Sequence, residues 1–407
     1  MSADVVAPGR TLRDALHQRL LAAPFDPAAL GRDALRARLG TLLHDEAPLV
    51  TRAAAARVLD EVVAEVDGLG PLQPLLADPT ITEIMVNGPN RVFVERAGRI
   101  EPVPCDLDAD AIVRIAQRVI APLGLRLDRA APMVDARLSD GSRLHAVLPP
   151  LAPDGPCLTI RRFSVRHLGL SDFGLAAGPV VFLETIVRAG ASIVVSGATS
   201  AGKTTCANAL AQAIDPTERI VTIEETVELR LGHPHVVRLE ARPANAEGAG
   251  AVSVRELVRA ALRMRPDRLV VGEVRGGEAF DMLQAVNTGH DGSLSTVHAN
   301  SAADALARLE TLVLLGGVAL PLASVRAQLA AAIDVVVQVG RGADGTRQIL
   351  EVAEVGNARG GRTLVARPLL QRVDGQLETR EAPARPPRRA GFDIEEAWSR
   401  CGLSSSR

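Results

Sequence analysis

Residues 11 to 67 carry apolar side chains at helical spacing. Leu12, Leu16 and Leu20 recur every four residues, and leucines and valines continue this pattern further along. Arg and Asp fill the opposite faces. The pattern predicts a helical N-terminal arm over residues 1–67, which is either a small helical domain or a docking element. A turn-rich run with two glycines and a proline follows and marks a domain boundary.

Short apolar stretches separated by turns characterise residues 68–166, and this pattern predicts a small α+β domain. One amphipathic helix is expected over residues 110–121. The predicted strands are Ile84–Val86, Val92–Val94, Ile100–Val103, Met133–Leu138, Arg143–Leu148 and Leu158–Phe163. The segment 167–178 is interpreted as a linker.

Strands and helices alternate over residues 179–372, which is typical of a mostly parallel α/β sheet. The predicted strands are Ile193–Ser196, Ile220–Ile223, Leu269–Val271, Leu294–Val297 and Val335–Val339. The predicted helices are Thr204–Ile214, Val254–Met264, Ala279–Val286, Ala302–Leu315 and Leu322–Ala331. Residues 373–407 form a tail rich in Pro and Arg, which we expect to be largely disordered.

A phosphate-binding loop follows the first of these strands. The spacing G-x-x-x-x-G-K-T is present, and strand, loop and helix occur in the order that the motif requires. Lys203 is predicted to reach the β- and γ-phosphates of ATP, the Thr204 hydroxyl to bind Mg²⁺, and the backbone to cradle phosphate. The predicted nucleotide-binding residues are Gly197, Ala198, Thr199, Ser200, Ala201, Gly202, Lys203, Thr204 and Thr205.

Two acidic segments accompany this loop. Glu273 ends an apolar strand and is our preferred residue for polarising the attacking water, a role commonly worth about 10² to 10⁴ in rate. The strand before residue 224 delivers Glu224, Glu225 and Glu228 to one rim. Clustered carboxylates suit a site near Mg²⁺, where Glu224 is a candidate ligand through water and Glu225 a second candidate base. A solvated acidic turn remains the alternative.

A histidine-containing segment, residues 288–300, places His290 and His298 on either side of a predicted strand. Both are candidates for contacts with phosphates or metal-bound water, and a structural role is the alternative. His298 is a candidate catalytic residue. The spacing of zinc ligands is absent.

Composition narrows the class of protein further. The chain has 407 residues, 47% hydrophobic and 23% charged, which suits a soluble protein of two or three domains. A net charge of −2 and the absence of Tyr argue against a nucleic-acid binder. Four scattered cysteines suggest neither disulfides nor zinc. Neither a signal peptide nor a spanning helix is predicted.

Taken together, these segments resemble the secretion and pilus-assembly ATPases of the type II/type IV secretion superfamily, most closely the tight-adherence (Flp) pilus branch. The motifs that carry the resemblance are GATSAGKTT, IVTIEETVEL, LVVGEVRGGEA and TGHDGSLSTVHANS. Upstream, VDARLSDGSRLHAVLPPL and LTIRRF also match. One departure is Glu225, since the acidic motif usually reads I-E-D and this chain has I-E-E at residues 223–225.

The resemblance implies a RecA-like P-loop ATPase domain after a PAS-like α+β domain, in subunits that form a homo-hexamer. Arginines of the N-terminal domain and linker approach the phosphates in that family, and the matching positions are Arg143 and Arg161, with Arg162 beside them. Surface ion pairs are the alternative for these arginines. The implied cofactors are ATP and Mg²⁺.

The implied function is an ATP-driven motor for pilus assembly or protein secretion. Its implied partner is a polytopic inner-membrane platform protein, through which a cytoplasmic protein would contact the inner face of the membrane peripherally. A nucleic-acid-translocating RecA-type ATPase is the alternative, although no nucleic-acid partner is expected. A metabolite kinase would need an acceptor pocket and a lid, and a non-enzymatic scaffold would not need an intact Lys203, Thr204 and Glu273.

Overall fold

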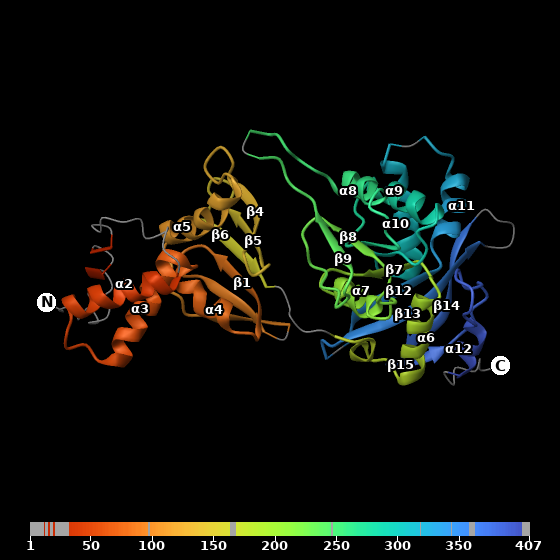
Figure 1. Cartoon of the computed structure of the whole chain (residues 1–407), viewed down its shortest axis with the longest axis horizontal. Helices are drawn as coiled ribbons and strands as arrows, with labels where there is room; N and C mark the ends of the chain where they lie inside the picture. Colours follow the sequence, from red (N-terminus) through yellow and green to blue (C-terminus); the bar gives the residue numbers. More distant parts are fainter. Residues whose placement is uncertain are drawn as a thin grey trace. The chain divides into compact units, whose positions relative to one another are not determined.

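The computed structural model describes most of the chain, and its contacts divide into two units, residues 1–164 and 165–407 (Figure 1). The described residues are 12, 15–16, 19–20, 32–96, 98–162, 168–245, 247–317, 319–342, 344–357 and 363–400. Each unit is described by itself. Among the described residues, no helix has both the length and the apolar character needed to cross a membrane.

The first unit begins with the helical arm. Helices α2 (Arg32–Glu46) and α3 (Arg52–Asp67) pack against each other, and Leu16, Leu35, Leu39 and Val62 form a buried leucine and valine core between the helical segments. The Thr51 hydroxyl caps α3 by accepting a hydrogen bond from the backbone N–H of Ala54. The predicted helical spacing is therefore confirmed where the structure describes the arm, while residues 21–31 lie outside the described residues.

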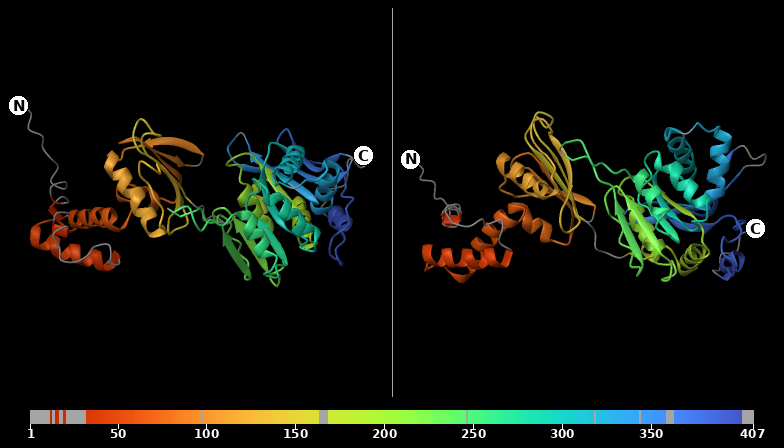
Figure 2. Two further views of the ribbon diagram at one scale, coloured as in Figure 1. Left: turned by 90° about the horizontal axis from the view of Figure 1, so that it is seen from above. Right: turned by 45° about the horizontal axis from the view of Figure 1, so that its top comes forward.

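The rest of the first unit is a six-stranded antiparallel sheet with helix α5 (Ala109–Ile120) packed against one face (Figure 2). The strand order is β3-β2-β1-β6-β5-β4. The strands are β1 (Ile81–Asn87), β2 (Val92–Arg96), β3 (Arg99–Val103), β4 (Met133–Arg137), β5 (Arg143–Val147) and β6 (Cys157–Arg161). The short helices η2 (Gly70–Leu72), α4 (Gln73–Ala77) and η3 (Ala121–Leu123) complete it. Each predicted strand is present, which confirms the α+β fold class.

The second unit is built on a nine-stranded sheet of order β15-β14-β13-β12-β7-β11-β10-β8-β9. The strands from β12 to β9 in this order are parallel, and β13, β14 and β15 are antiparallel. Their bounds are β7 (Ile193–Gly197), β8 (Ile220–Glu224), β9 (Val236–Glu240), β10 (Arg268–Val271), β11 (Leu294–His298), β12 (Val335–Arg341), β13 (Arg347–Asn357), β14 (Leu364–Val373) and β15 (Gln376–Thr379).

Helices cover both faces of this sheet (Figure 2), and each face has its own apolar core. One core includes α6 (Ala177–Arg188), α7 (Lys203–Ala211) and α12 (Ile394–Arg400). The other is formed by α8 (Val254–Ala261), α9 (Glu278–Asn287), α10 (Ala302–Leu315) and α11 (Leu322–Ala332). Because both faces are buried, the central parallel strands are apolar throughout. The predicted α/β class is confirmed.

Part of the predicted linker belongs to the core of the second unit. Leu170 and Phe173 lie in the short helix η4 (Leu170–Phe173), and both side chains are buried together with Leu175. All three residues fall within the segment 167–178 that was interpreted as a linker. In the structure, the three apolar side chains belong to one of the two cores that cover the sheet of the second unit.

The C-terminal tail differs most from its prediction. Instead of disorder, residues 376–400 include β15, which extends the sheet, and α12, which lies beside α6 (Figure 1). The Trp398 ring meets the edge of the Phe182 ring at a centroid distance of 4.9 Å. A composition rich in Pro and Arg suggested disorder. In the structure, the buried Trp398 side chain and hydrogen bonds from the tail arginines to buried acceptors such as Asp334 hold this segment in place.

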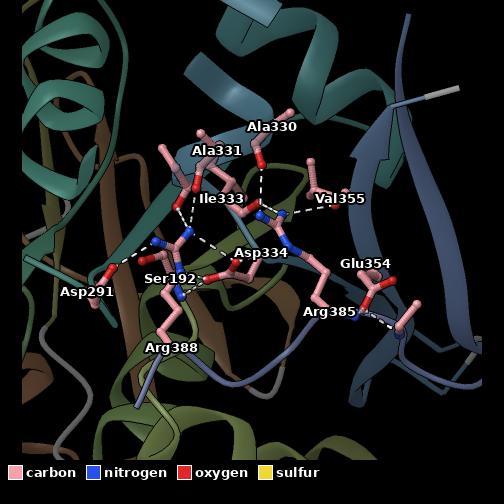
Figure 3. A network of polar contacts seen from close by, with 12 residues as sticks. Ser192, Asp291, Ala330, Ala331, Ile333, Asp334, Glu354, Val355, Arg385 and Arg388 are labelled. Carbon is pink, nitrogen blue, oxygen red and sulfur yellow. Dashed lines mark hydrogen bonds and ion pairs between the residues drawn. The ribbon is translucent and has the colours of Figure 1, made fainter. Parts of the chain in front are cut away.

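Two arginines of the tail bind buried carboxylates and carbonyl groups at the start of β7 and β12 (Figure 3). Arg388 forms an ion pair with Asp334, whose carboxylate also accepts the backbone N–H of Ser192 at 2.8 Å. Arg385 donates to the carbonyl oxygens of Ala330 and Val355. These contacts lie at the amino end of β7, whereas the phosphate-binding loop lies at its carboxyl end.

Candidate functional site

The phosphate-binding loop occupies the predicted position between β7 and α7. Gly197 ends β7 and is in register with His298 of β11 on one side and Val339 of β12 on the other. A Cβ atom on Gly197 would lie 2.6 Å from the Val339 carbonyl oxygen, so a larger residue would displace the strand. Gly202 has a φ of 102°, which favours glycine, and the next residue begins α7.

Lys203 folds back over its own loop. Its Nζ donates to the carbonyl oxygens of Gly197 and Ala198, both at 3.1 Å. The loop thus brings its ammonium group to the end of β7, beside the backbone N–H groups that open α7. Lys203 is also the only lysine of the chain. An ammonium and a helix N-terminus at one place favour an anion, and phosphate fits this donor set.

The remaining residues of the loop have separate surroundings. Ala201 is buried, whereas Ala198, Thr199 and Ser200 are exposed and Thr205 is half-buried. The Thr204 hydroxyl lies 3.5 Å from the Glu228 carboxylate. A hydroxyl beside a carboxylate is an oxygen donor set of the kind that Mg²⁺ prefers, so these side chains fit the ion.

Glu224 anchors the acidic segment. Its side chain is buried at the end of β8, and its Oε1 accepts the backbone N–H groups of Glu228 and Leu229, both at 2.9 Å. Its Oε2 is buried without a hydrogen-bond partner among the described residues. Burial, together with the nearby Glu228 and Glu240 carboxylates, raises the pKa of Glu224 to about 7, and this rise outweighs the lowering effect of the hydrogen bonds from the Glu228 and Leu229 backbone N–H groups. This pair of backbone contacts fixes the turn that carries Glu228 toward Thr204.

Gly272 makes room for Glu224. A Cβ atom on Gly272 would lie 2.6 Å from Glu224 Cγ, and the Gly272 N–H donates to the Ile223 carbonyl. Since Glu273 is the next residue, close packing at Gly272 holds the two acidic segments at one edge of the sheet. The sequence predicted both segments, and the structure brings them together.

One arginine bridges the two candidate bases. Arg275 donates through Nη1 to Glu225 at 2.8 Å and through Nη2 to Glu273 at 2.9 Å. The side chains of Glu225 and Arg275 are 64% and 56% exposed, and that of Glu273 is 29% exposed. Exposed ion pairs are worth at most about 1 kcal/mol, so either carboxylate can exchange its partner at little cost. No role of Arg275 was predicted from the sequence.

The two histidines lie at opposite ends of β11. His298 ends the strand, is half-buried and is in register with Gly197, which places it beside the phosphate-binding loop. His290 precedes the strand, and its ring nitrogen contacts the Ala285 carbonyl oxygen at 3.0 Å. The two histidines thus lie at opposite ends of one strand, and the contact with Ala285 supports the structural alternative for His290.

In the first unit, Arg143 and Arg161 are direct cross-strand neighbours on β5 and β6. Neighbouring Leu144 and Ile160 point to the apolar core, so both arginines lie on the other face. Arg137 of β4 pairs with Arg143 in the same row and was not recognised from the sequence. Arg162 instead donates to the Ile81 carbonyl oxygen at 3.0 Å, which gives it a structural role.

Two further arginines that the sequence did not point to lie against the phosphate-binding loop. Arg341 donates to the Ser200 carbonyl oxygen at 3.1 Å, and Arg347 packs against Gly202. Both flank the turn between β12 and β13. The signal available in the sequence was Asp344-Gly345 between two alternating apolar stretches, which is typical of a hairpin.

Comparisons with known proteins identify relatives of this chain. A putative conjugal transfer protein of Mycobacterium tuberculosis is 44% identical over 308 residues, covering 73% of this chain and 87% of that protein. The type IV secretion system protein VirB11 of Brucella suis is 35% identical over 319 residues, covering 70% and 88%. The crystal structure of the pilus retraction motor PilT with bound ADP covers 74% of this chain and 83% of its own, at 21% identity and a TM-score of 0.51, and shares the fold.

The family model described as Type II/IV secretion system protein matches residues 65–360. This range includes the six-stranded sheet, the phosphate-binding loop, both acidic segments and the histidine strand. The chain belongs to the type II/IV secretion system protein family.

Proposed function

We propose that this protein is a Mg²⁺-dependent ATPase that powers pilus assembly or protein secretion. The observation that carries the proposal is the position of Lys203, Thr204 and Glu273 at the carboxyl edge of the parallel sheet, with Lys203 at the N-terminus of α7. Membership of the secretion family supports the motor function, because its relatives are named for conjugal transfer and type IV secretion.

Each residue of the site has a distinct task in this proposal. Lys203 exchanges its two carbonyl contacts for phosphate oxygens, and the N–H groups opening α7 bind the same phosphates. Thr204 and Glu228 would hold Mg²⁺, and Glu224 would support the turn that carries Glu228. Bound Mg²⁺ would neutralise the charge that develops on the phosphate oxygens.

Glu273 orients and polarises the attacking water in this scheme. Its contact with Arg275 holds it at the edge of the site, and release of that contact frees its carboxylate. Glu225 is the second candidate base and shares the same arginine. In this proposal His298 contacts the γ-phosphate or metal-bound water, and its register with the first glycine of the loop supports this role.

We further propose that six copies form a ring and that Arg143 and Arg161 approach the γ-phosphate. Support comes from their placement, because the two arginines are direct cross-strand neighbours on one face of the sheet and could bind one anion together. The proposed partner is a polytopic inner-membrane platform protein, which would hold the ATPase at the cytoplasmic face of the membrane. The tight-adherence branch remains a prediction from sequence motifs.

The test compares wild-type protein with Lys203→Ala and Lys203→Arg. Wild type is expected to bind ATP and to hydrolyse it slowly in Mg²⁺, and Lys203→Ala to lose both properties. Lys203→Arg is the matched control for charge, because Arg keeps the charge but not the compact ammonium group. ATP affinity that is unchanged in Lys203→Ala refutes the proposed site.

The single lysine offers a second readout. An amine-reactive reagent can modify only Lys203 and the N-terminal amine, so peptide mapping reports the state of the loop directly. ATP is expected to protect Lys203 and to leave the N-terminus reactive. The same preparations distinguish the alternative function, since hydrolysis stimulated by single-stranded or duplex DNA would favour a nucleic-acid translocase.

A further inference from the structure

The turn between β12 and β13 lies beside the phosphate-binding loop. The Gly342 N–H donates to the Thr346 carbonyl oxygen at 2.8 Å, and Asp344 accepts from both the backbone N–H and the hydroxyl of Thr346. The ends of the two strands, Arg341 and Arg347, are directly opposite each other. The ends of the two strands thus bring two arginine side chains to the phosphate-binding loop.

Arg347 lies directly over the second glycine of the loop. A Cβ atom on Gly202 would lie 2.7 Å from Arg347 Cδ and 3.0 Å from its Nε. Gly202 therefore serves two purposes, because it adopts a φ of 102° and leaves space for the arginine. The three heavy atoms nearest to that Cβ position all belong to Arg347.

Arg341 binds the other side of the same loop. Its Nε donates to the Ser200 carbonyl oxygen at 3.1 Å, and its Nη1 donates to the Gly345 carbonyl oxygen at 3.0 Å. The first contact ties the hairpin to the loop, and the second ties the arginine to its own turn. Ser200 has a φ of 60°, so this contact supports a loop conformation that a non-glycine residue rarely adopts.

Three positively charged side chains, those of Lys203, Arg341 and Arg347, therefore contact the phosphate-binding loop. Arg341 and Arg347 are opposite each other on antiparallel strands, an arrangement that is unfavourable for like charges. Lys203 adds a third positive charge at the end of the same loop. Arginine binds phosphate through planar, two-pronged hydrogen bonds, so guanidinium groups beside this loop suit a phosphate ligand.

We propose that the β12–β13 hairpin is a second phosphate-binding element of the same subunit, with Arg347 contacting the nucleotide and Arg341 positioning the loop. The inference rests on the proposed nucleotide-binding function. Gly202 precedes the helix N-terminus that cradles the α- and β-phosphates. Arg347 accordingly acts on phosphates that ADP and ATP share, unlike Arg143 and Arg161, which are proposed for the γ-phosphate.

The experiment measures the dissociation constants of ADP and of a non-hydrolysable ATP analogue by calorimetry. Arg347→Gln keeps the aliphatic stem over Gly202 and removes the charge. We expect it to weaken binding of both nucleotides by the same factor, about ten- to a hundredfold for one charged hydrogen-bonding group. Arg341→Gln is expected to weaken both by a smaller factor, and Arg347→Lys to recover part of the loss.

Arg380→Gln is the matched control. Arg380 follows β15, contacts Gln371 and Glu378, and lies on the same antiparallel extension of the sheet. It is expected to bind both nucleotides as wild type does. Fluorescence of Trp398, the only tryptophan, checks that each variant is folded.

Three results would overturn the inference. Wild-type affinity for ADP in Arg347→Gln removes the arginine from the site. A loss confined to the ATP analogue assigns it to the γ-phosphate instead. If Arg347→Gln does not fold, wild-type ADP affinity in Arg341→Gln rejects the hairpin. Failure of the wild-type protein itself to bind ADP is a different result, since it refutes the proposed function together with this inference.

Discussion

Replacing Glu218 by Gln should destabilise the second unit strongly. Glu218 binds Arg268, whose side chain is fully buried, through two hydrogen bonds of 2.6 and 3.1 Å. The other donors of Arg268 bind the carbonyl oxygens of Gly292 and Val187. Gln keeps the shape but removes the charge, so the guanidinium stays buried without its counter-ion. The tail adds Arg389, which also donates to Glu218.

The magnitude follows from two independent arguments. Removing one partner of a buried ion pair commonly costs about 3 to 5 kcal/mol. Burial alone would raise the pKa of Glu218, but the hydrogen bonds from Arg268 and Arg389 outweigh it and lower the pKa to about 2. A decrease from 4.5 to about 2 corresponds to about 3 kcal/mol of stability at neutral pH. This value is the cost of losing one partner and not the net contribution of the pair. Burial lowers the pKa of Arg268 and so disfavours its charged form, which offsets part of the gain from the pair.

The sign of the pH dependence is also fixed. The folded-state pKa of Glu218 is below its unfolded value, so its contribution is complete above about pH 4.5 and is lost as the pH falls toward 2. The assay is urea unfolding followed by Trp398 fluorescence, at pH 7 and at pH 3.5. Wild type should lose stability between these conditions, and Glu218→Gln should lose less.

A matched control separates the buried pair from ion pairs in general. Glu378 pairs with Arg380 at 3.2 Å, but its side chain is 46% exposed, so Glu378→Gln should cost less than about 1 kcal/mol. A loss of less than 1 kcal/mol in Glu218→Gln as well would refute the reasoning. It would mean that Arg268 finds water or another partner when Glu218 is neutral.

Three further predictions concern turnover and the tail. Glu273→Gln should retain ATP binding and lose turnover by about 10² or more, measured by phosphate release, and a larger loss in Glu225→Gln would reassign the base. Arg143→Ala and Arg161→Ala, made separately, should lower turnover by up to about 10³ while ADP affinity stays unchanged, whereas wild-type turnover in both would remove the N-terminal domain from catalysis. Replacing Trp398 by Ala should cost about 3 kcal/mol and expose the tail to limited proteolysis, because its ring is buried against α6; unchanged protection would show that the tail is held by its arginines alone.

The local parts of the site could be predicted from the sequence. Spacing alone identified Gly197, Gly202, Lys203 and Thr204, because the loop conformation depends on neighbouring residues in the chain. The apolar parallel strands and the acidic residue after β10 were equally visible, since burial on both faces demands continuous apolar runs. The short antiparallel strands of the first unit could also be predicted, because turn residues mark where each strand ends.

Contacts between distant segments were decided only by the tertiary structure. The bridge from Arg275 to Glu225 and Glu273 depends on the order of β8 and β10 in the sheet, and the packing of Arg347 on Gly202 joins residues far apart in sequence. The ordered tail has the same origin, because its composition favours disorder until buried acceptors such as Asp334 are in place. Spacing encodes a loop, whereas the partners of a charge are set by which strands become neighbours.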